Sequence, residues 1–119
     1  IMAQGVGQAI AENKLGDKIK VIGFDSDDKT ISFLKEGALA YRRINELAMQ
    51  VLSRDGILAT CSCSHFMRDD LFRQMLHDAA KDAGVRLRQI EGRQQSPDHP
   101  ILWNVPETNY LKFYLFQVV

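Results

Sequence analysis

The sequence has 119 residues, which suits a single domain covering residues 1–119. A chain of this size buries roughly two thirds of the surface that its unfolded form exposes, so it can form a core without a metal or a disulfide. Basic and acidic residues number fifteen each, so the formal charge is zero and strong nucleic-acid binding is not expected. No run approaches the roughly 20 apolar residues of a membrane span. We therefore expect no membrane contact and a cytoplasmic location for the chain as expressed.

The first half of the chain alternates helix and strand patterns. Apolar residues recur at helical spacing in residues 1–13, and the β-rich run Ile19–Phe24 then predicts a strand that ends at Asp25. A second helix is expected over residues 27–37 and a third over Tyr41–Leu52. The inward stripe predicted for the third helix comprises Ile44, Leu47, Ala48, Val51 and Leu52.

The second half contains the stretch around which the chain is organised. Gly56–Ser64 is an apolar run that closes in small polar residues and thiols, which is typical of a buried strand with a site at its carboxyl end. A long apolar stripe predicts a helix from Asp69 to a stop at Gly84. Residues 85–90 alternate like an edge strand, and residues 110–119 are apolar on both faces, like an interior strand. The stripe of the helix comprises Leu71, Phe72, Met75, Leu76, Ala79, Ala80 and Ala83.

The connections between the four predicted strands determine their order. Helices separate the first three strands, which should therefore be parallel. No helix separates the last two, so the last strand should be antiparallel. Placing the apolar last strand between the second and third gives a four-stranded mixed sheet of order 1-2-4-3, in a Rossmann-like three-layer half-sandwich.

Both cysteines of the chain, Cys61 and Cys63, lie at the carboxyl end of the second strand, where chemistry collects in open α/β sheets. Their spacing on a strand places the two Cα atoms about 6.6 Å apart, at the far limit for a disulfide, so we interpret them as thiols in a reducing compartment. With His65 and His99 they are also candidates for a metal site. Because no second cysteine pair is present, no metal is expected. Elsewhere, His77 is expected to be solvated and Trp103 to cover the core.

Residues 41–119 resemble the carboxyl-terminal part of S-adenosylmethionine-dependent methyltransferases of the large-subunit rRNA cytosine-C5 type. Four motifs carry the resemblance: Tyr-Arg-Arg-Ile-Asn-Glu-Leu-Ala from Tyr41, Gly-Ile-Leu-Ala-Thr-Cys-Ser-Cys-Ser from Gly56, Pro-Asp-His-Pro from Pro97, and Pro-Glu-Thr-Asn-Tyr-Leu-Lys from Pro106. They occur in the order of the family. The family sheet places its fourth, fifth, seventh and sixth strands in the order derived above.

Residues 1–40 instead resemble the second lobe of a periplasmic sugar-binding protein of the ribose-binding type. The resemblance rests on Gly-Asp-Lys-Ile-Lys-Val-Ile-Gly-Phe-Asp from Gly16 and on Leu-Lys-Glu-Gly-Ala-Leu-Ala from Leu34. Together the two resemblances indicate an engineered or recombined chimera joined near Tyr41. Its parents would be periplasmic and cytoplasmic.

The resemblances also imply site residues. Methylation of cytosine at C5 requires a thiolate to add at C6, which makes Cys61 the nucleophile candidate and Cys63 the second. Asp25 corresponds to a sugar-contacting acid, and Asp98 and His99 lie in a loop that leaves the same sheet edge, as further ligand-binding candidates. In the methyltransferases, a glycine-rich loop and an acid that cradle S-adenosylmethionine lie on earlier strands.

Three functional hypotheses follow. The first is a chimeric scaffold with no intact catalytic activity and no cofactor. The alternatives are a methyltransferase remnant that uses a cysteine on pyrimidine RNA, and a residual sugar or small-ligand binder at Asp25. As a partner we expect a second copy of the chain, because strand 19–24 would be an uncovered apolar edge that can pair in a homodimer.

Overall fold

The computed structural model describes residues 19–24, for which only the backbone is described, and residues 37–119. The described strands are β1 (Ile19–Phe24), β2 (Ile57–Ser62), β3 (Leu87–Arg93) and β4 (Lys112–Val118). The helices are α3 (Ala38–Val51), α4 (Asp69–Ala83) and the short 3-10 helix η2 (Pro106–Thr108). The helix expected in residues 1–13, the helix expected in residues 27–37 up to Glu36 and the site candidate Asp25 lie outside the described residues, and Gly37 is the N-cap residue of α3.

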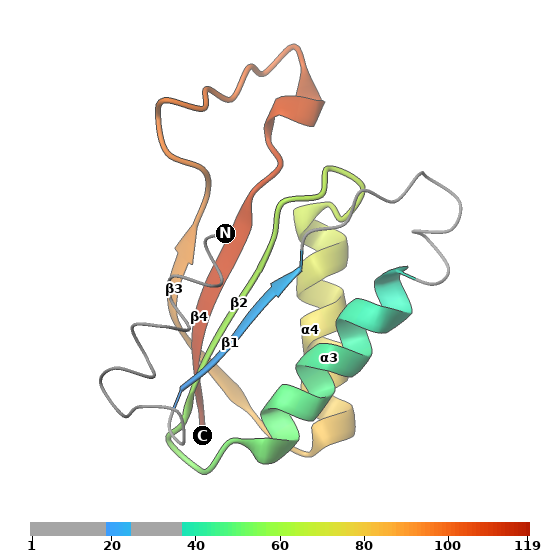
Figure 1. The fold of residues 1–119 in the computed structure, drawn as a ribbon, viewed down its shortest axis with the longest axis vertical. Helices are drawn as coiled ribbons and strands as arrows, with labels where there is room; N and C mark the ends of the chain where they lie inside the picture. The colour runs from blue at the N-terminus through green and yellow to red at the C-terminus, as the bar shows by residue number, and fades with distance from the viewer. Residues whose placement is uncertain (1–18, 25–36) are drawn as a thin grey trace.

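The described strands form one sheet in the order β1-β2-β4-β3 (Figure 1). Strand β4 is antiparallel to both of its neighbours, β2 and β3, and β1 pairs in parallel with β2. The interior position of β4 follows from its composition, since a strand that is apolar on both faces is stable only with neighbours on both sides. In this register Lys112, the first residue of β4, lies opposite Ser62 at the carboxyl end of β2.

Helices α3 and α4 pack side by side on one face of the sheet (Figure 1). The described residues therefore show a methyltransferase-like α/β fold with one helical layer, and the second layer of the expected half-sandwich lies outside them. Neither described helix is long and apolar enough to cross a membrane. The buried core of this layer comprises Tyr41, Ala48, Met49, Leu52, Leu58, Met67, Phe72, Met75, Leu76, Ala79, Ala80 and Val118.

The predicted stripe of α4 is confirmed, whereas that of α3 is confirmed at Ala48 and Leu52 and wrong at Leu47 and Val51. Val51 is 65% exposed and Leu47 is also exposed, whereas Tyr41 and Asn45 are buried. Asn45 has hydrogen-bond partners in the core, so a polar residue outside the predicted apolar stripe is buried there.

Glycine ends α4 as predicted. Gly84 adopts φ 72°, and its backbone N–H bonds to the carbonyls at the end of the helix. Asp69 and Asp70 lie in the first turn, where negative charge is favourable.

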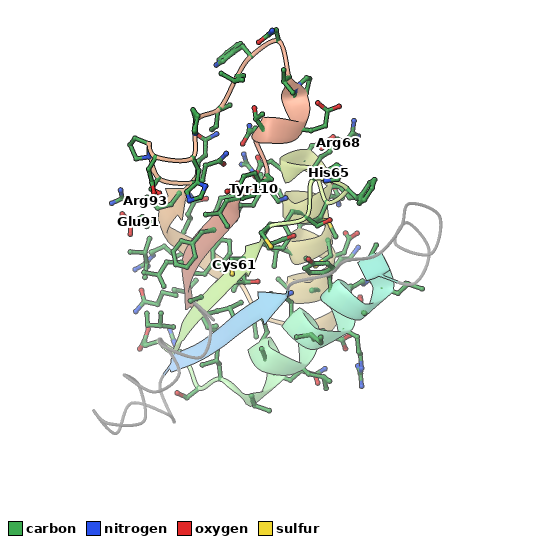
Figure 2. All side chains as sticks on the ribbon, turned by 45° about the horizontal axis from the view of Figure 1, so that its top comes forward. Cys61, His65, Arg68, Glu91, Arg93 and Tyr110 are labelled. Carbon is green, nitrogen blue, oxygen red and sulfur yellow. The ribbon has the colours of Figure 1, made fainter. Side chains whose placement is uncertain are left out.

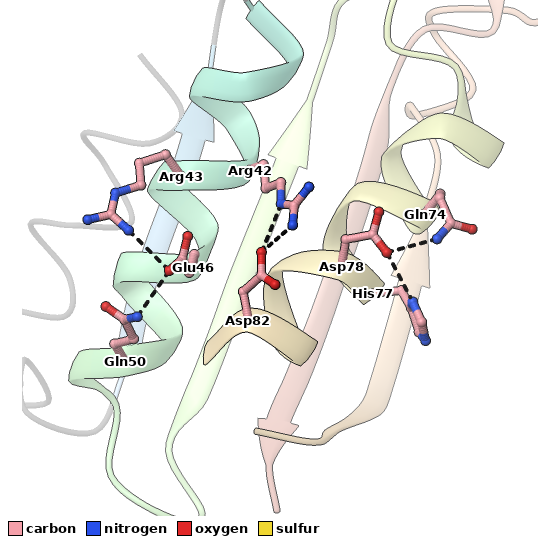
Figure 3. A network of polar contacts seen from close by, with 8 residues as sticks. All are labelled: Arg42, Arg43, Glu46, Gln50, Gln74, His77, Asp78 and Asp82. Atoms are coloured by element: carbon pink, nitrogen blue, oxygen red, sulfur yellow. Dashed lines mark hydrogen bonds and ion pairs between the residues drawn. The ribbon is translucent and has the colours of Figure 1, made fainter. Parts of the chain in front are cut away.

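One polar pair links the outer surfaces of the two helices, and further polar pairs lie within each helix (Figure 3). Arg42 on α3 donates to Asp82 on α4, and this hydrogen bond and charge raise the pKa of Arg42. Gln74 donates to Asp78, and this bond, together with the contact of His77, lowers the pKa of Asp78. His77 is exposed, as predicted.

Strand β3 lies at the edge of the sheet and begins later than the predicted run 85–90. Its pairing with β4 shifts by one residue at Ile90, which is the extra residue of a β-bulge. After the bulge, Gly92 lies opposite Tyr114. A Cβ at Gly92 would come within 3.1 Å of the Tyr114 ring, so this position favours glycine.

The loop between β3 and β4 extends beyond the sheet at the top of Figure 1. Thr108 holds it together, since its Oγ1 accepts from the Leu102 N–H at 2.8 Å and donates to the Val105 carbonyl at 2.7 Å. Trp103 is 96% exposed. The prediction that Trp103 covers the core is therefore wrong, because the loop satisfies its own backbone groups without packing on the sheet.

Candidate functional site

The end of β2 and the turn after it present two different sets of side chains. Thr60, Ser62 and Ser64 are buried, while Cys61 is half-buried and both Cys63 and His65 are exposed. This alternation follows the two-residue period of a strand and continues past the last residue of β2. The small hydroxyl side chains are thus directed to the helices, and the thiols are directed away from them.

A buried polar network fixes the hydroxyl set to α3. The Thr60 hydroxyl donates to Asn45 Oδ1 at 2.8 Å, and Asn45 Nδ2 donates to the Tyr41 carbonyl at 2.8 Å. The Tyr41 and Ser62 hydroxyls share a further bond of 2.8 Å. Among the described residues no buried side-chain N or O atom lacks a hydrogen-bond partner. A fully satisfied network of this kind holds the strand end in one position.

The turn at residues 63–67 is anchored at several points. The Ser64 N–H donates to Ser62 Oγ at 3.3 Å, and the Met67 N–H donates to the Ser64 carbonyl at 3.2 Å. The Met67 side chain is 0% exposed within the core. Figure 2 shows His65 and Arg68 at this turn and Cys61 below it on the sheet. The exposed thiol of Cys63 therefore stands on a backbone that buried groups hold in place.

The two cysteines have different surroundings. Neither forms a disulfide, in agreement with the prediction. Cys61 is half-buried within β2, where Phe113 lies opposite it on β4. Cys63 lies beyond the strand, is exposed and interacts electrostatically with Lys112. A nucleophile needs access to its substrate, so the geometry favours Cys63.

Lys112 is a buried cation at this sheet edge and is only 5% exposed. Its Nζ donates to the Ser64 carbonyl at 2.6 Å and to the Tyr110 carbonyl at 2.7 Å. Burial lowers the pKa of Lys112 to about 8, and the charges of Cys63 and Asp69 only partly oppose this shift. The ammonium group therefore remains mostly protonated at pH 7.

A second polar pair joins α4 to β4 near Lys112. The Tyr114 hydroxyl donates to Asp69 at the start of α4. Burial and this bond raise the pKa of Tyr114 to about 12. The phenol thus remains protonated through the physiological range.

A polar groove of about 470 Å³ opens beside these residues, between α4 and the strands β3 and β4. Its size lies in the range of small-molecule sites. Lys112, which interacts with Cys63, forms part of its wall. The other polar side chains of the wall belong to Asp69, Arg73, Gln89, Arg93, Gln94, Asn109 and Tyr114.

The remaining predicted site residues do not join the turn. Asp98 accepts a bond from Ser96, which lowers the pKa of Asp98, and His99 Nε2 lies 3.7 Å from the Asp98 carboxylate. Both are exposed in the loop between β3 and β4. Within residues 37–119 no three His, Cys, Asp or Glu side chains are grouped to hold a metal. The metal set of Cys61, Cys63, His65 and His99 is therefore not assembled.

Sequence reasoning missed Lys112 and Asn45. The signal for Lys112 was present, because a lysine at the start of a strand that is apolar on both faces must be either paired or at the strand end. Asn45 could not be found in this way, since its partner Thr60 is 15 residues away and only the fold brings them together.

The arrangement of the sheet defines the class of protein. Strands β1 and β2 are parallel, and the last strand, β4, is antiparallel and lies between β2 and the edge strand β3. This is the arrangement of a methyltransferase-like α/β fold. Two solved structures support this assignment of the fold. One is SMU.776, named as a methyltransferase and solved in complex with SAH, with a TM-score of 0.70 and 16% identity over 95% of this chain and 30% of that chain. The other is named as a SAM-dependent methyltransferase from Streptococcus mutans, with a TM-score of 0.65 over 95% of this chain and 29% of that chain.

Sequence comparison adds particular relatives. The chain is 45% identical over 86 residues to ribosomal RNA large subunit methyltransferase I of Pseudoalteromonas atlantica, which is 72% of this chain and 22% of the relative. It is 41% identical over 106 residues to the proteins of the same name from Shigella dysenteriae and Escherichia coli O157:H7, which is 87% of this chain and 27% of each relative. The chain thus spans about a quarter of the length of these relatives. The sequence matches no protein-family model.

These findings do not support the chimera hypothesis. The match of 106 residues is longer than the 79 residues of 41–119, so methyltransferase similarity extends into residues 1–40. No sugar-binding protein stands among these relatives, and a periplasmic origin of residues 1–40 is not supported. A short apolar strand that ends in an acid is common to many α/β folds, so the motif from Gly16 does not by itself indicate a sugar-binding protein.

Proposed function

We propose that the chain is the carboxyl-terminal part of the catalytic domain of an S-adenosylmethionine-dependent methyltransferase that acts on cytosine C5 in large-subunit rRNA. The observation that carries the proposal is the exposed thiol of Cys63 on an anchored turn at the carboxyl end of β2. The names of the relatives support the substrate class. In our proposal the alternative hypothesis, a part of a methyltransferase that uses a cysteine, thus replaces the hypothesis of a scaffold without activity.

Cys63, with Cys61 as the second candidate, acts on the pyrimidine in this proposal. The Cys63 thiol loses its proton, and the thiolate Sγ forms a bond to C6 of the cytosine, which makes C5 nucleophilic. Once C5 has taken the methyl group that S-adenosylmethionine would supply, loss of the C5 proton to water re-forms the C5–C6 double bond, so the Sγ–C6 bond breaks and the thiolate is released. The groove beside Lys112 offers amide and guanidinium donors at Gln94, Asn109 and Arg93, but neither cysteine is among the residues that line it.

S-adenosylmethionine would supply an electrophilic methyl group. The described residues do not fit a cradle for it, because no glycine-rich turn lies at the carboxyl edge of β2 among them. Gly56 and Gly84 lie in turns at the opposite edge, and Gly92 lies within β3. In this proposal the described part of the chain provides the groups that act on the base. The formal charge of the whole sequence is zero, so we expect that the chain does not bind RNA tightly by itself.

A graft tests the proposal. Residues 41–119 replace the corresponding part of the Escherichia coli relative, and methyl transfer to large-subunit rRNA is measured with the Cys63→Ala and Cys61→Ala variants. We expect Cys63→Ala to lose activity by at least about 10³-fold, while Cys61→Ala retains most of it. Equal activity of the two variants, or a folded graft that binds the cofactor but transfers no methyl group, would contradict the proposal.

The homodimer through strand β1 also stays a proposal. β1 lies at one end of the described strand order, so its outer edge can pair with a second copy. Light scattering of the chain at increasing concentration tests it, and a mass that stays at 13.5 kDa would contradict it.

A further inference from the structure

We propose that Lys112 is a positioning residue for Cys63: its ammonium group holds the turn that carries the thiol and stabilises the thiolate. This inference rests on the proposed function, because it assigns Lys112 a part in the preparation of the nucleophile. The thiol can nevertheless be measured without RNA or cofactor. The two proposals can therefore fail separately.

The first argument is the tether that Lys112 forms. Its Nζ bonds the carbonyl of Ser64, the residue after Cys63, and the carbonyl of Tyr110 on the segment that enters β4. Lys112 also lies opposite Ser62 in the sheet register. The side chain of Lys112 therefore fixes the turn after β2 to the start of β4. It does so at Ser64, the residue that follows Cys63.

The second argument is the charge around the ammonium group. Two groups act on it electrostatically: Cys63 from the turn and Asp69 from α4. Asp69 also accepts from the Tyr114 hydroxyl, which engages part of its acceptor capacity. Two of the three ammonium donors bond carbonyls, so one N–H can turn toward an anion beside it. A thiolate at Cys63 would provide that anion.

The third argument is the cost of placing a lysine here. A buried cation is unfavourable unless it has partners, and two carbonyl oxygens alone replace only part of its hydration. A hydrocarbon side chain would fill the position without this cost. A residue that acts only as a tether would not need a full charge, so the charge favours anions nearby, and Asp69 and a thiolate at Cys63 are the two that act on it.

The experiment measures the reactivity of Cys63 as a function of pH. In the Cys61→Ala background Cys63 is the only cysteine, and its alkylation rate with iodoacetamide is followed from about pH 5 to about pH 10. The pH of half-maximal rate reports the stability of the thiolate and does not depend on access to the thiol. The urea-unfolded chain gives the reference profile.

Two matched variants separate the tether from the charge. Lys112→Gln keeps two N–H donors for the carbonyls without the charge, and Lys112→Arg keeps the charge. We expect the folded parent to reach half-maximal rate at a lower pH than the unfolded chain. Lys112→Gln should move this pH upward and slow alkylation at pH 7 by about 3- to 10-fold, whereas Lys112→Arg should restore most of the rate.

Two results would overturn the inference. One is the same half-maximal pH in Lys112→Gln and Lys112→Arg, with both variants folded by circular dichroism. The other result needs no variant of Lys112. It is the same dependence of the alkylation rate on pH in the folded parent and in the unfolded chain. If the profiles shift as expected but the graft with Cys63→Ala still methylates rRNA, the proposed function fails and the role of Lys112 stands.

Discussion

The turn at residues 63–67 and the loop at residues 94–111 both lie at the carboxyl edge of the sheet, and both carry polar motifs that the sequence marks as functional. They differ in how the structure holds them. The turn is tied to the core by Met67, by the Ser62 hydroxyl and by the buried ammonium of Lys112. The loop is held mainly by contacts within itself, and the Trp103 side chain is in solvent. Anchoring by buried groups, and not the presence of polar residues, distinguishes the candidate site.

The largest expected difference between the two segments is the effect of removing a large apolar side chain from each. Met67→Ala should lower the free energy of unfolding by about 3 kcal/mol, because it leaves a cavity in the core. Trp103→Ala should change it by less than about 0.5 kcal/mol, because the ring is exposed. Urea denaturation of both variants provides the measurement. A large loss in Trp103→Ala would mean that the loop is anchored as well.

A smaller difference is expected when the same substitution, threonine to valine, is made at the end of β2 that leads into the turn and in the loop. Thr60→Val removes the donor to the buried Asn45 side chain and should cost about 2 kcal/mol, since an unsatisfied acceptor remains in the core. Thr108→Val removes bonds to an exposed loop backbone, where water replaces the lost partner, and should cost about 0.5 kcal/mol. Comparable losses in the two variants by urea denaturation would show that the network at Thr60 is not special.

The same contrast explains what the sequence could predict. The stripe of α4, the stop at Gly84 and the strand Ile57–Ser62 depend on local periodicity and local backbone preference, so they could be predicted. The antiparallel position of β4 also followed from its composition and the missing crossover helix. These features require no knowledge of distant partners.

The features that the sequence analysis did not predict depend on residues that are distant in the sequence. Part of the buried face of α3 was missed because Asn45 is buried with its partner Thr60, and the hydrogen bond of Lys112 to Ser64 joins residues 48 positions apart. The two thiols were correctly placed at a strand end, but only the turn geometry distinguishes half-buried Cys61 from exposed Cys63. The comparisons do not support the sugar-binding resemblance, whose motif describes a strand that many α/β folds share.

The last prediction uses pH to compare the buried Lys112 of the anchored edge with the exposed Asp98 of the loop. Burial lowers the pKa of Lys112 from 10.5 to about 8, so between these values the unfolded chain binds a proton that the folded chain has lost. The free energy of unfolding should therefore rise with pH across this window, by on the order of 1 kcal/mol after allowance for partial screening.

Two further groups complete the pH profile. Above about pH 10 the raised pKa of Tyr114, about 12, has the opposite effect, because the unfolded phenol ionises first. The lowered pKa of Asp98 adds stability that is lost only as the pH falls through the acid range. Urea midpoints from pH 6 to pH 12 should thus pass through a maximum near about pH 10. Lys112→Met should remove the rise and Tyr114→Phe the fall, and a parent midpoint that declines steadily above pH 8 would show that Lys112 is not buried as a cation.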